Sequence, residues 1–246
     1  MDNKKISSMR AAGEILANTF EHISEHIVEG ISAGQVDDMI RQFIESNNAS
    51  PGFLGYQGFK YSSCISKNEE IVHGIPSQDK LFFDGDIVSI DIGVKYQGFY
   101  ADAARTFLIG NVSDEAKFLV KITEESFFNA MKGISSKSKL GDISFGIQEY
   151  VESNGLTVVK DLYSHGIGKS LHEDPLIPNY GKKGSGIQLR NGMTMAIEPM
   201  VNLGVPDIVT LDDNWTIVTQ DLKWSAHYEN TILITDDGVE ILTINR

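Results

Sequence analysis

The stretch Asp86–Phe107, with the sequence DIVSIDIGVKYQGFYADAARTF, constrains the fold more than any other part of the chain. Apolar residues alternate with small or polar ones across 88–94, and an alternation of period two is typical of a half-buried strand. Lys95–Gly98 supplies a turn, because glycine readily adopts a positive φ, and 99–109 runs back as a second strand. The sequence therefore predicts a β-hairpin.

This hairpin brings two carboxylates together. A turn symmetric about the Tyr96–Gln97 bond puts Asp91 directly opposite Asp102, with their Cβ atoms about 5 Å apart. Two like charges in direct opposition destabilise a sheet, so a shared proton, an arginine or a cation must offset the repulsion. From the residues alone, the pair is a metal site, a general acid–base pair of the glycosidase type, or a coincidence with a different strand register.

The composition is that of an ordinary globular protein. The 246 residues are 41% hydrophobic and 22% charged, which suits one α/β domain with a large core. A net charge of −13 argues against nucleic acid or an anionic membrane as a partner. The single cysteine, Cys64, allows no intrachain disulfide, and the sequence has no secretory h-region or long apolar run. We expect one domain spanning 1–246, located in the cytoplasm.

The layout of the helices repeats. Spacings of three and four between apolar residues predict four helices, which cover approximately 7–29, 35–46, 116–131 and 136–150. The tripeptides Gly-Ile-Ser and Glu-Ser-Asn flank the second helix of each pair, at 30–32 and 45–47 and again at 133–135 and 152–154. The repeat predicts a diverged duplication, with two αβ halves around a pseudo-two-fold axis and a ligand site between them.

Two further carboxylates interrupt apolar strands in the second half. Strands are predicted at 158–164, 192–201, 215–219 and 227–234. Alternation puts Glu198 on one face with Thr194 and Ala196, and Glu229 on one face with His227 and Thr231. A buried carboxylate needs a charge partner, hydrogen bonds or a metal.

Histidines complete a set of metal-ligand types. His73 lies in a loop sequence, and His165 and His172 bracket the segment HGIGKSLH. An odd spacing on one strand puts His165 and His172 on opposite faces, so one could bind a metal while the other faces a substrate. Four carboxylates with imidazole suit Mn²⁺, Fe²⁺ or Co²⁺, and carboxylates can bridge two ions about 3.5–4 Å apart. No Gly-x-Ser-x-Gly or Walker A motif supports a nucleophile or nucleotide site.

The motifs together closely resemble the methionine aminopeptidases. In chain order they are Asn68–Pro76 (NEEIVHGIP), Asp91 and Asp102 in the hairpin, His165–Glu173 (HGIGKSLHE), Ile197–Pro199 (IEP) and Tyr228–Thr231 (YENT). The order and the separations agree over nearly the whole chain. The short interval between the last two motifs is similar to that of the bacterial type I enzymes.

The resemblance implies a fold and an activity. The fold is the pita-bread fold of class α/β (α+β), with two αβ halves around a central, curved, mainly antiparallel sheet. The activity is removal of the initiator methionine from nascent polypeptides, preferably before a small residue, by water activated at two divalent ions (Co²⁺, Mn²⁺ or Fe²⁺). A transient ribosome contact and a monomeric state are also expected.

The resemblance also implies residue roles. The metal ligands would be Asp91, Asp102, His165, Glu198 and Glu229, of which Asp102 and Glu229 would bridge the ions. Glu198 would move a proton, and His73 and His172 would contact the substrate and its tetrahedral intermediate. The methionine side chain would lie against Tyr56, Phe59, Cys64, Leu171 and Trp215.

The chain departs from the family pattern at several positions. His227 occurs where the family usually has Gln, Asn230 where it has His, and Lys67 where an apolar residue is usual. Leu171 is often aromatic in the family. Two rival hypotheses remain at this point, namely an Xaa-Pro peptidase and a non-catalytic binding module of the same fold.

Overall fold

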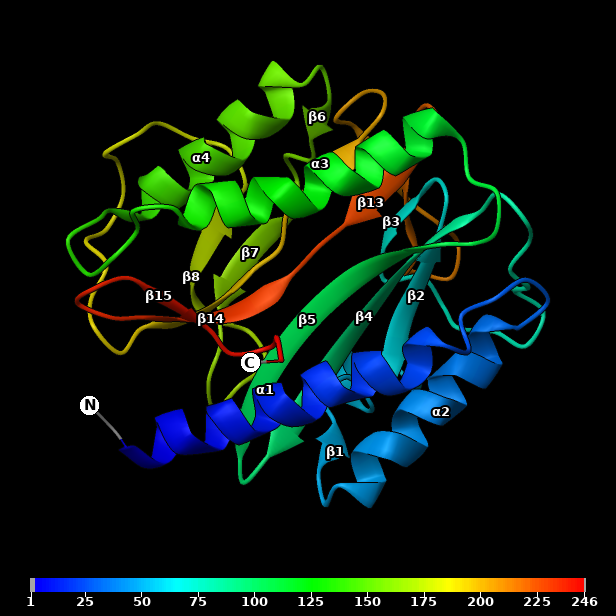
Figure 1. Ribbon diagram of the computed structural model, residues 1–246, viewed down its shortest axis with the longest axis horizontal. Coiled ribbons are helices and arrows are strands. Elements are labelled where there is room, and N and C mark those ends of the chain that lie inside the picture. Colours follow the sequence, from blue (N-terminus) through cyan, green and yellow to red (C-terminus); the bar gives the residue numbers. More distant parts are fainter. Residues whose placement is uncertain (1–2, 246) are drawn as a thin grey trace.

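The computed structural model describes residues 3–245, so the two ends of the expected domain, 1–2 and 246, lie outside the described residues. Two pairs of helices lie on opposite sides of the strands (Figure 1). The helices are α1 (Asn3–Ser24), α2 (Ala33–Ser46), α3 (Asp114–Met131) and α4 (Leu140–Ser153). The predicted two-helix pattern of each half is confirmed.

The repeated tripeptides mark the same structural positions in both halves. Gly30 and Gly133 both have a positive φ, 88° and 75°, and each lies in the connection that leads to the second helix of its pair. Asn47 and Asn154 are the C-caps of α2 and α4. The prediction for the first helix is wrong at its end, because the His26 N–H donates to the Ile23 carbonyl in a tight turn that replaces the helical bond.

The strands form antiparallel sheets. The strands of the first half and the short helix among them are β1 (Ser50–Pro51), η1 (Tyr56–Gly58), β2 (Ser63–Lys67), β3 (Glu70–Val72), β4 (Ile87–Tyr96) and β5 (Phe99–Leu108). Those of the second half are β6 (Thr157–Val158), β7 (Tyr163–Gly166), β8 (Glu173–Pro178), β9 (Thr194–Ile197), β10 (Met200–Asn202), β11 (Ile208–Thr210), β12 (Ile217–Thr219), β13 (Ser225–His227), β14 (Asn230–Ile234) and β15 (Val239–Ile241). One sheet has the order β1-β4-β2 with β5 on β4, another has β15-β14-β9-β7-β8, and two small ones are β13-β10-β6 and β11-β12-β3.

The hairpin of β4 and β5 forms, but with a different register. Asp91 pairs with Ala104 and Asp102 pairs with Gly93, so the prediction that the aspartates lie in direct opposition is wrong by two residues. The turn is Gln97-Gly98, whose φ values of 49° and 85° suit a two-residue turn of type I′. Because a shift of two keeps a side chain on the same face, both aspartates still point to one side as diagonal neighbours.

The two larger sheets meet at β5. Ala104 and Glu229 exchange main-chain hydrogen bonds of 3.3 and 3.0 Å. Asp102 N–H donates to Thr231 Oγ1 over 2.8 Å, and the Thr231 hydroxyl donates to Asp102 O over 2.9 Å. These bonds align the segment 227–231 antiparallel to β5, so hydrogen bonds connect the strands of the first half to those of the second.

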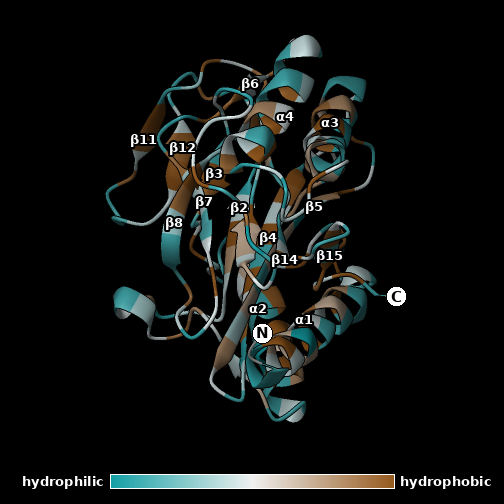
Figure 2. Cartoon of the chain, turned by 90° about the vertical axis from the view of Figure 1, so that its left-hand side faces the viewer, coloured by the Kyte–Doolittle hydropathy of each residue, from teal (hydrophilic) through white to brown (hydrophobic). Residues whose placement is uncertain are grey.

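Apolar side chains fill the space between the helix pairs and the strands. One cluster packs α1 and α2 against β4 and β5, and includes Leu16, Ile40 and Ile90. Another lies under α3 and α4, and includes Phe127 and Ile143. Brown apolar positions line the central strands in Figure 2, whereas the helices alternate between brown and teal. None of the helices in 3–245 has the length and apolar composition that crossing a bilayer requires.

Candidate metal centre and active site

A pocket of about 360 Å³ is lined by residues from both halves of the chain. Every site residue expected from the sequence lines it, namely Tyr56, Phe59, Cys64, His73, Asp91, Asp102, His165, Leu171, His172, Glu198, Trp215 and Glu229. Gln57 and Leu176 also line it, and no sequence pattern indicated them. Phe53, in the aromatic segment before β2, is a further wall residue.

Three acidic side chains lie close together at the floor of the pocket, two from the hairpin of β4 and β5 and one from the segment before β14. The β2–β4–β5 register runs from Cys64 to Asp91 to Ala104, and the paired bonds of Ala104 bring Glu229 alongside. Asp102 lies two residues before Ala104 on β5, so its side chain is on the same face of the sheet. Asp102 and Glu229 are buried, with exposed fractions of 3% and 2%.

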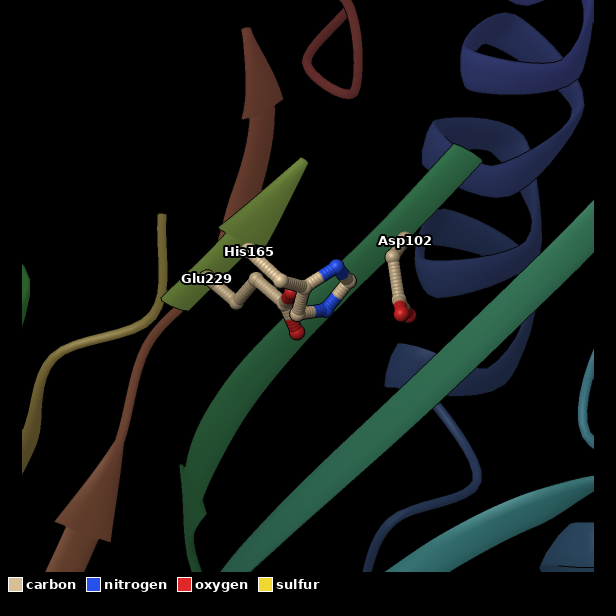
Figure 3. Close-up of side chains that lie close together, drawn as sticks. All are labelled: Asp102, His165 and Glu229. Carbon is tan, nitrogen blue, oxygen red and sulfur yellow. The ribbon is translucent and has the colours of Figure 1, made fainter. Parts of the chain in front are cut away.

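His165 joins this group from β7. Its Nδ1 lies 2.9 Å from the Gly166 carbonyl, which can only accept, so Nδ1 carries the proton and Nε2 presents its lone pair. Asp102, His165 and Glu229 each offer a ligand atom within 4.8 Å of the others. In Figure 3 their side chains converge from separate strands and from the segment before β14.

Glu198 lies just after β9, where Pro199 interrupts the strand that the sequence predicted as continuous over 192–201. Its N–H donates to Ser164 Oγ over 2.9 Å, and its carbonyl accepts from Asn179 Nδ2 over 2.8 Å. The Ser164 hydroxyl in turn donates to Asn179 Oδ1. This closed set of bonds fixes the backbone of Glu198, and Oε1 of its carboxylate lies 3.6 Å from His165 Nε2. Sequence reasoning missed both Ser164 and Asn179.

The electrostatics of the floor favour a cation. Burial raises the pKa of Asp91 to about 7 and that of Glu198 to about 8, and raises those of Asp102 and Glu229 well above their ordinary values. Asp91 Oδ1, Asp102 Oδ1 and Glu229 Oε1 are buried and have no hydrogen-bond partner within residues 3–245. Buried carboxylates without partners are costly, and carboxylate oxygens with one imidazole are ligands that Mn²⁺, Fe²⁺ and Co²⁺ accept. The residues present therefore fit a divalent metal.

The arginine alternative for offsetting the acidic charge fails on geometry. Arg105 follows Asp102 on β5, but its guanidinium donates to the main-chain carbonyls of Ala104, Glu229 and Thr243 and to the Asn230 side chain. It therefore supports the backbone of Glu229 instead of pairing with the carboxylates.

Two histidines line the pocket beside the floor. His172 lies beyond the end of β7, so the expectation of opposite faces does not apply, and its ring centroid is 4.2 Å from that of His165. Its Nδ1 is 2.8 Å from the Tyr56 hydroxyl. His73 has a φ of 58°, which is uncommon for a residue other than glycine and clusters at functional sites. Burial lowers the pKa of His73 to about 4, so its ring is neutral at pH 7.

Aromatic rings form one wall of the pocket. Phe59 packs edge-on against Trp215, with centroids 4.9 Å apart. The Trp215 loop is held by Asp213, which accepts hydrogen bonds from the N–H groups of Trp215 and Thr216. Together with Cys64 and Leu171, these rings make an apolar slot directly beside the acidic floor.

Comparison with known proteins agrees with this geometry. The model of "Metallopeptidase family M24" matches residues 7–236. The chain is 50% identical over 243 residues to a methionine aminopeptidase of Clostridium perfringens, covering 99% of this chain and 97% of that protein. The structure matches a methionine aminopeptidase crystal structure from Thermotoga maritima with a TM-score of 0.98 and 46% identity, covering 100% and 98% of the two chains.

A more distant match concerns the fold alone. An Xaa-Pro dipeptidase from Bacillus anthracis has a TM-score of 0.76 at 23% identity, and this chain covers 61% of it. The predicted pita-bread architecture is confirmed by these structural matches. The chain therefore belongs to metallopeptidase family M24, in the group of methionine aminopeptidases, hydrolases that remove an N-terminal methionine.

Proposed function

We propose that this pocket removes the initiator methionine of nascent polypeptides with two divalent ions held by Asp91, Asp102, His165, Glu198 and Glu229. The observation that carries the proposal is that these side chains converge on one pocket, from three strands, the residue after β9 and the segment before β14. Three of their carboxylate oxygens are buried and have no hydrogen-bond partner in the described part of the chain. Asp102 and Glu229 are central to the set and are assigned as bridging ligands. Asp91 would complete the site of one ion, and His165 with Glu198 that of the other.

The residues divide the chemistry among them. The bound ions would supply Lewis acidity toward the scissile carbonyl and toward an attacking water. We assign Glu198 to accept the proton of that water and to deliver it to the leaving amine. His73 and His172 would donate hydrogen bonds to the substrate carbonyl as negative charge develops there. Both rings are poor bases in this setting, since burial lowers the pKa of each.

The aromatic slot accounts for the preference for methionine. A thioether side chain is unbranched and polarizable, and it packs well against aromatic rings, which Phe59 and Trp215 supply. The slot adjoins the acidic floor, so a bound methionine would bring its free α-amino group to the carboxylate side. That arrangement favours an exopeptidase over an enzyme that cleaves within a chain.

The test compares two peptides on one preparation. Metal-free protein is loaded with Mn²⁺ or Co²⁺, and its metal content and its hydrolysis of Met-Ala-Ser and of an Xaa-Pro peptide are measured. We expect about two ions per chain, cleavage of the methionyl peptide, and little cleavage of the other. Preferential cleavage of the Xaa-Pro peptide would favour the rival peptidase. Absence of both metal and methionyl cleavage would favour a binding module.

The biological setting is part of the same proposal. One domain over 1–246 would act as a monomer in the cytoplasm and meet its substrates as they leave the ribosome. Sedimentation of the purified protein tests the monomer, and co-pelleting with ribosomes that carry nascent chains tests the contact. Fragments that fold separately after limited proteolysis would contradict the single domain.

A further inference from the structure

His227 is a buried histidine next to the ligand set that the proposed chemistry does not use. It is the last residue of β13 and is 1% exposed. Its Nε2 has no hydrogen-bond partner in the part of the chain that the structure describes. A buried polar atom without a partner is unfavourable unless it serves a neighbour, so the surroundings of this ring identify its role.

The main chain holds the ring in place from two directions. His227 pairs with Met200 on β10. Its N–H donates to Thr106 Oγ1 over 3.2 Å, and its carbonyl accepts from the Thr106 hydroxyl over 2.8 Å. Since Thr106 lies on β5, the same strand that carries Asp102, the position of His227 is tied to the floor of the pocket.

The nearest carboxylate to the ring is that of Glu198. His227 Nε2 is 3.4 Å from Glu198 Oε2 and 4.0 Å from Glu229 Oε2. Glu198 Oε1, on the other side, is 3.6 Å from His165 Nε2. Glu198 is thus held between two imidazoles, and each of its oxygens faces one of them.

The two imidazoles are not equivalent. The Nδ1–H of His165 is engaged by a carbonyl, so its Nε2 offers a lone pair to a metal. His227 does not line the pocket; it lines a separate cavity of about 60 Å³ with Arg105, Glu124 and Tyr228. Glu198, His227 and Glu229 do offer ligand atoms within 4.8 Å of one another. Because the His227 ring lies outside the pocket where the other ligands meet, the geometry favours a hydrogen bond to the Glu198 carboxylate over metal ligation.

We propose that His227 is a positioning residue: its Nε2 now lies 3.4 Å from Oε2 of Glu198 without a hydrogen bond, and when metal is held its Nε2–H donates to that oxygen, so that Oε1 is presented to the metal on the His165 side. The inference rests on the proposed role of Glu198 as a metal ligand.

The test uses substitutions that separate the donor from the imidazole. His227→Gln keeps an N–H donor, His227→Leu removes it, and His227→Asn shortens it beyond reach. His26→Gln, at an exposed histidine after α1, is the matched control for incidental metal binding. Calorimetry measures Mn²⁺ binding to each metal-free protein, absorption spectra of the Co²⁺ forms report the ligand set, and a methionyl tripeptide gives kcat and KM.

We expect His227→Leu and His227→Asn to bind metal about 10–100-fold more weakly and to lose kcat more than they change KM. His227→Gln and the control should stay near wild type, and the Co²⁺ spectrum of His227→Gln should be unchanged. Wild-type affinity in both donor-free variants would overturn the inference. So would a His227→Gln protein that loses as much affinity as His227→Leu with an altered Co²⁺ spectrum, because the imidazole itself would then be a ligand.

Failure of this inference differs from failure of the proposed function. A wild-type protein that binds no divalent ion contradicts the metal centre itself. A wild-type protein that binds metal normally, beside donor-free variants that match it, contradicts only the role of His227. Urea unfolding of each variant in chelator shows whether that variant is folded. If His227→Leu does not fold, His227→Asn takes its place as the donor-free variant.

Discussion

Replacing Arg105 with leucine should destabilise the metal-free protein and loosen the site above it. Arg105 is partly buried, and its Nη2 lies 2.7 Å from Asn230 Oδ1 and 3.1 Å from Thr243 O. Its central carbon is 5.2 Å from the ring centroid of Phe20 and 4.5 Å from that of Tyr228. The cation therefore joins α1, β5 and the C-terminal segment at one point.

The loss of stability depends on which acceptors of Arg105 keep another hydrogen-bond donor after the substitution. Glu229 O still accepts from Ala104 N–H, and Asn230 Oδ1 still accepts from the Thr243 hydroxyl. Only the bond to Thr243 O needs a new donor, at about 1.5–3 kcal/mol for a charged hydrogen bond. The two ring contacts add about 1 kcal/mol each. Burial lowers the pKa of Arg105, which marks a desolvation cost that leucine avoids, so the net loss should be about 3 kcal/mol.

The assay is urea or thermal unfolding of metal-free Arg105→Leu against wild type. A loss of this size corresponds to a fall in Tm of about 6–12 °C for a chain of this length. Arg105→Lys keeps the charge and should lose about half as much. The control is Arg41→Leu, which removes an exposed pair with Glu45 and should leave the unfolding transition close to that of wild type. An Arg105→Leu protein within 1 kcal/mol of wild type would refute the reasoning.

Three further predictions address the site. Asp102→Ala should abolish turnover and weaken the binding of both ions in calorimetry; near-normal turnover would contradict the bridging role. His172→Ala should lose turnover while metal analysis shows the ions retained, and loss of metal would contradict a role in substrate contact. The metal-free protein should lose stability as the pH rises from 6.5 to 8. The folded pKa values of Asp91 (about 7) and Glu198 (about 8) exceed their ordinary values of 3.8 and 4.5. The folded state therefore binds more protons than the unfolded state in this window, and raising the pH favours unfolding. Bound Mn²⁺ should remove this slope and release protons on binding at pH 7; a stability that rises with pH in this window without metal would contradict the raised values.

The hairpin illustrates how far local sequence rules reach. The period-two alternation predicts β4 and β5 well, and the face shared by Asp91 and Asp102 survives an error of two residues. The register itself depends on which residues make the turn, and Gln97 adopts a positive φ that its residue type does not predict. The common face of the two aspartates was predicted correctly, the assumed direct opposition was wrong, and the metal between them stays a prediction.

The rest of the site depends on contacts that no local pattern encodes. Ser164 and Asn179 orient Glu198 from positions far along the chain, and common polar residues of this kind have no distinctive spacing. Pro199 signalled extended geometry at Glu198, yet the break between β9 and β10 follows from where each strand finds its partner. Every residue that the motif resemblance indicated lines the pocket, because the order and separation of motifs record tertiary proximity that periodicity cannot.

The reciprocal bonds between β5 and the segment 227–231 also bear on how the protein folds. The hairpin of β4 and β5 is contiguous and can form early, whereas Asp102 meets Thr231 only across a separation of 129 positions. Contacts of such long range form late, since loop closure precedes any gain from them. A nascent copy can therefore build its first αβ half while its carboxylate set is still incomplete. Metal uptake should follow docking of the C-terminal strands, which makes it a reporter of the last stage of folding.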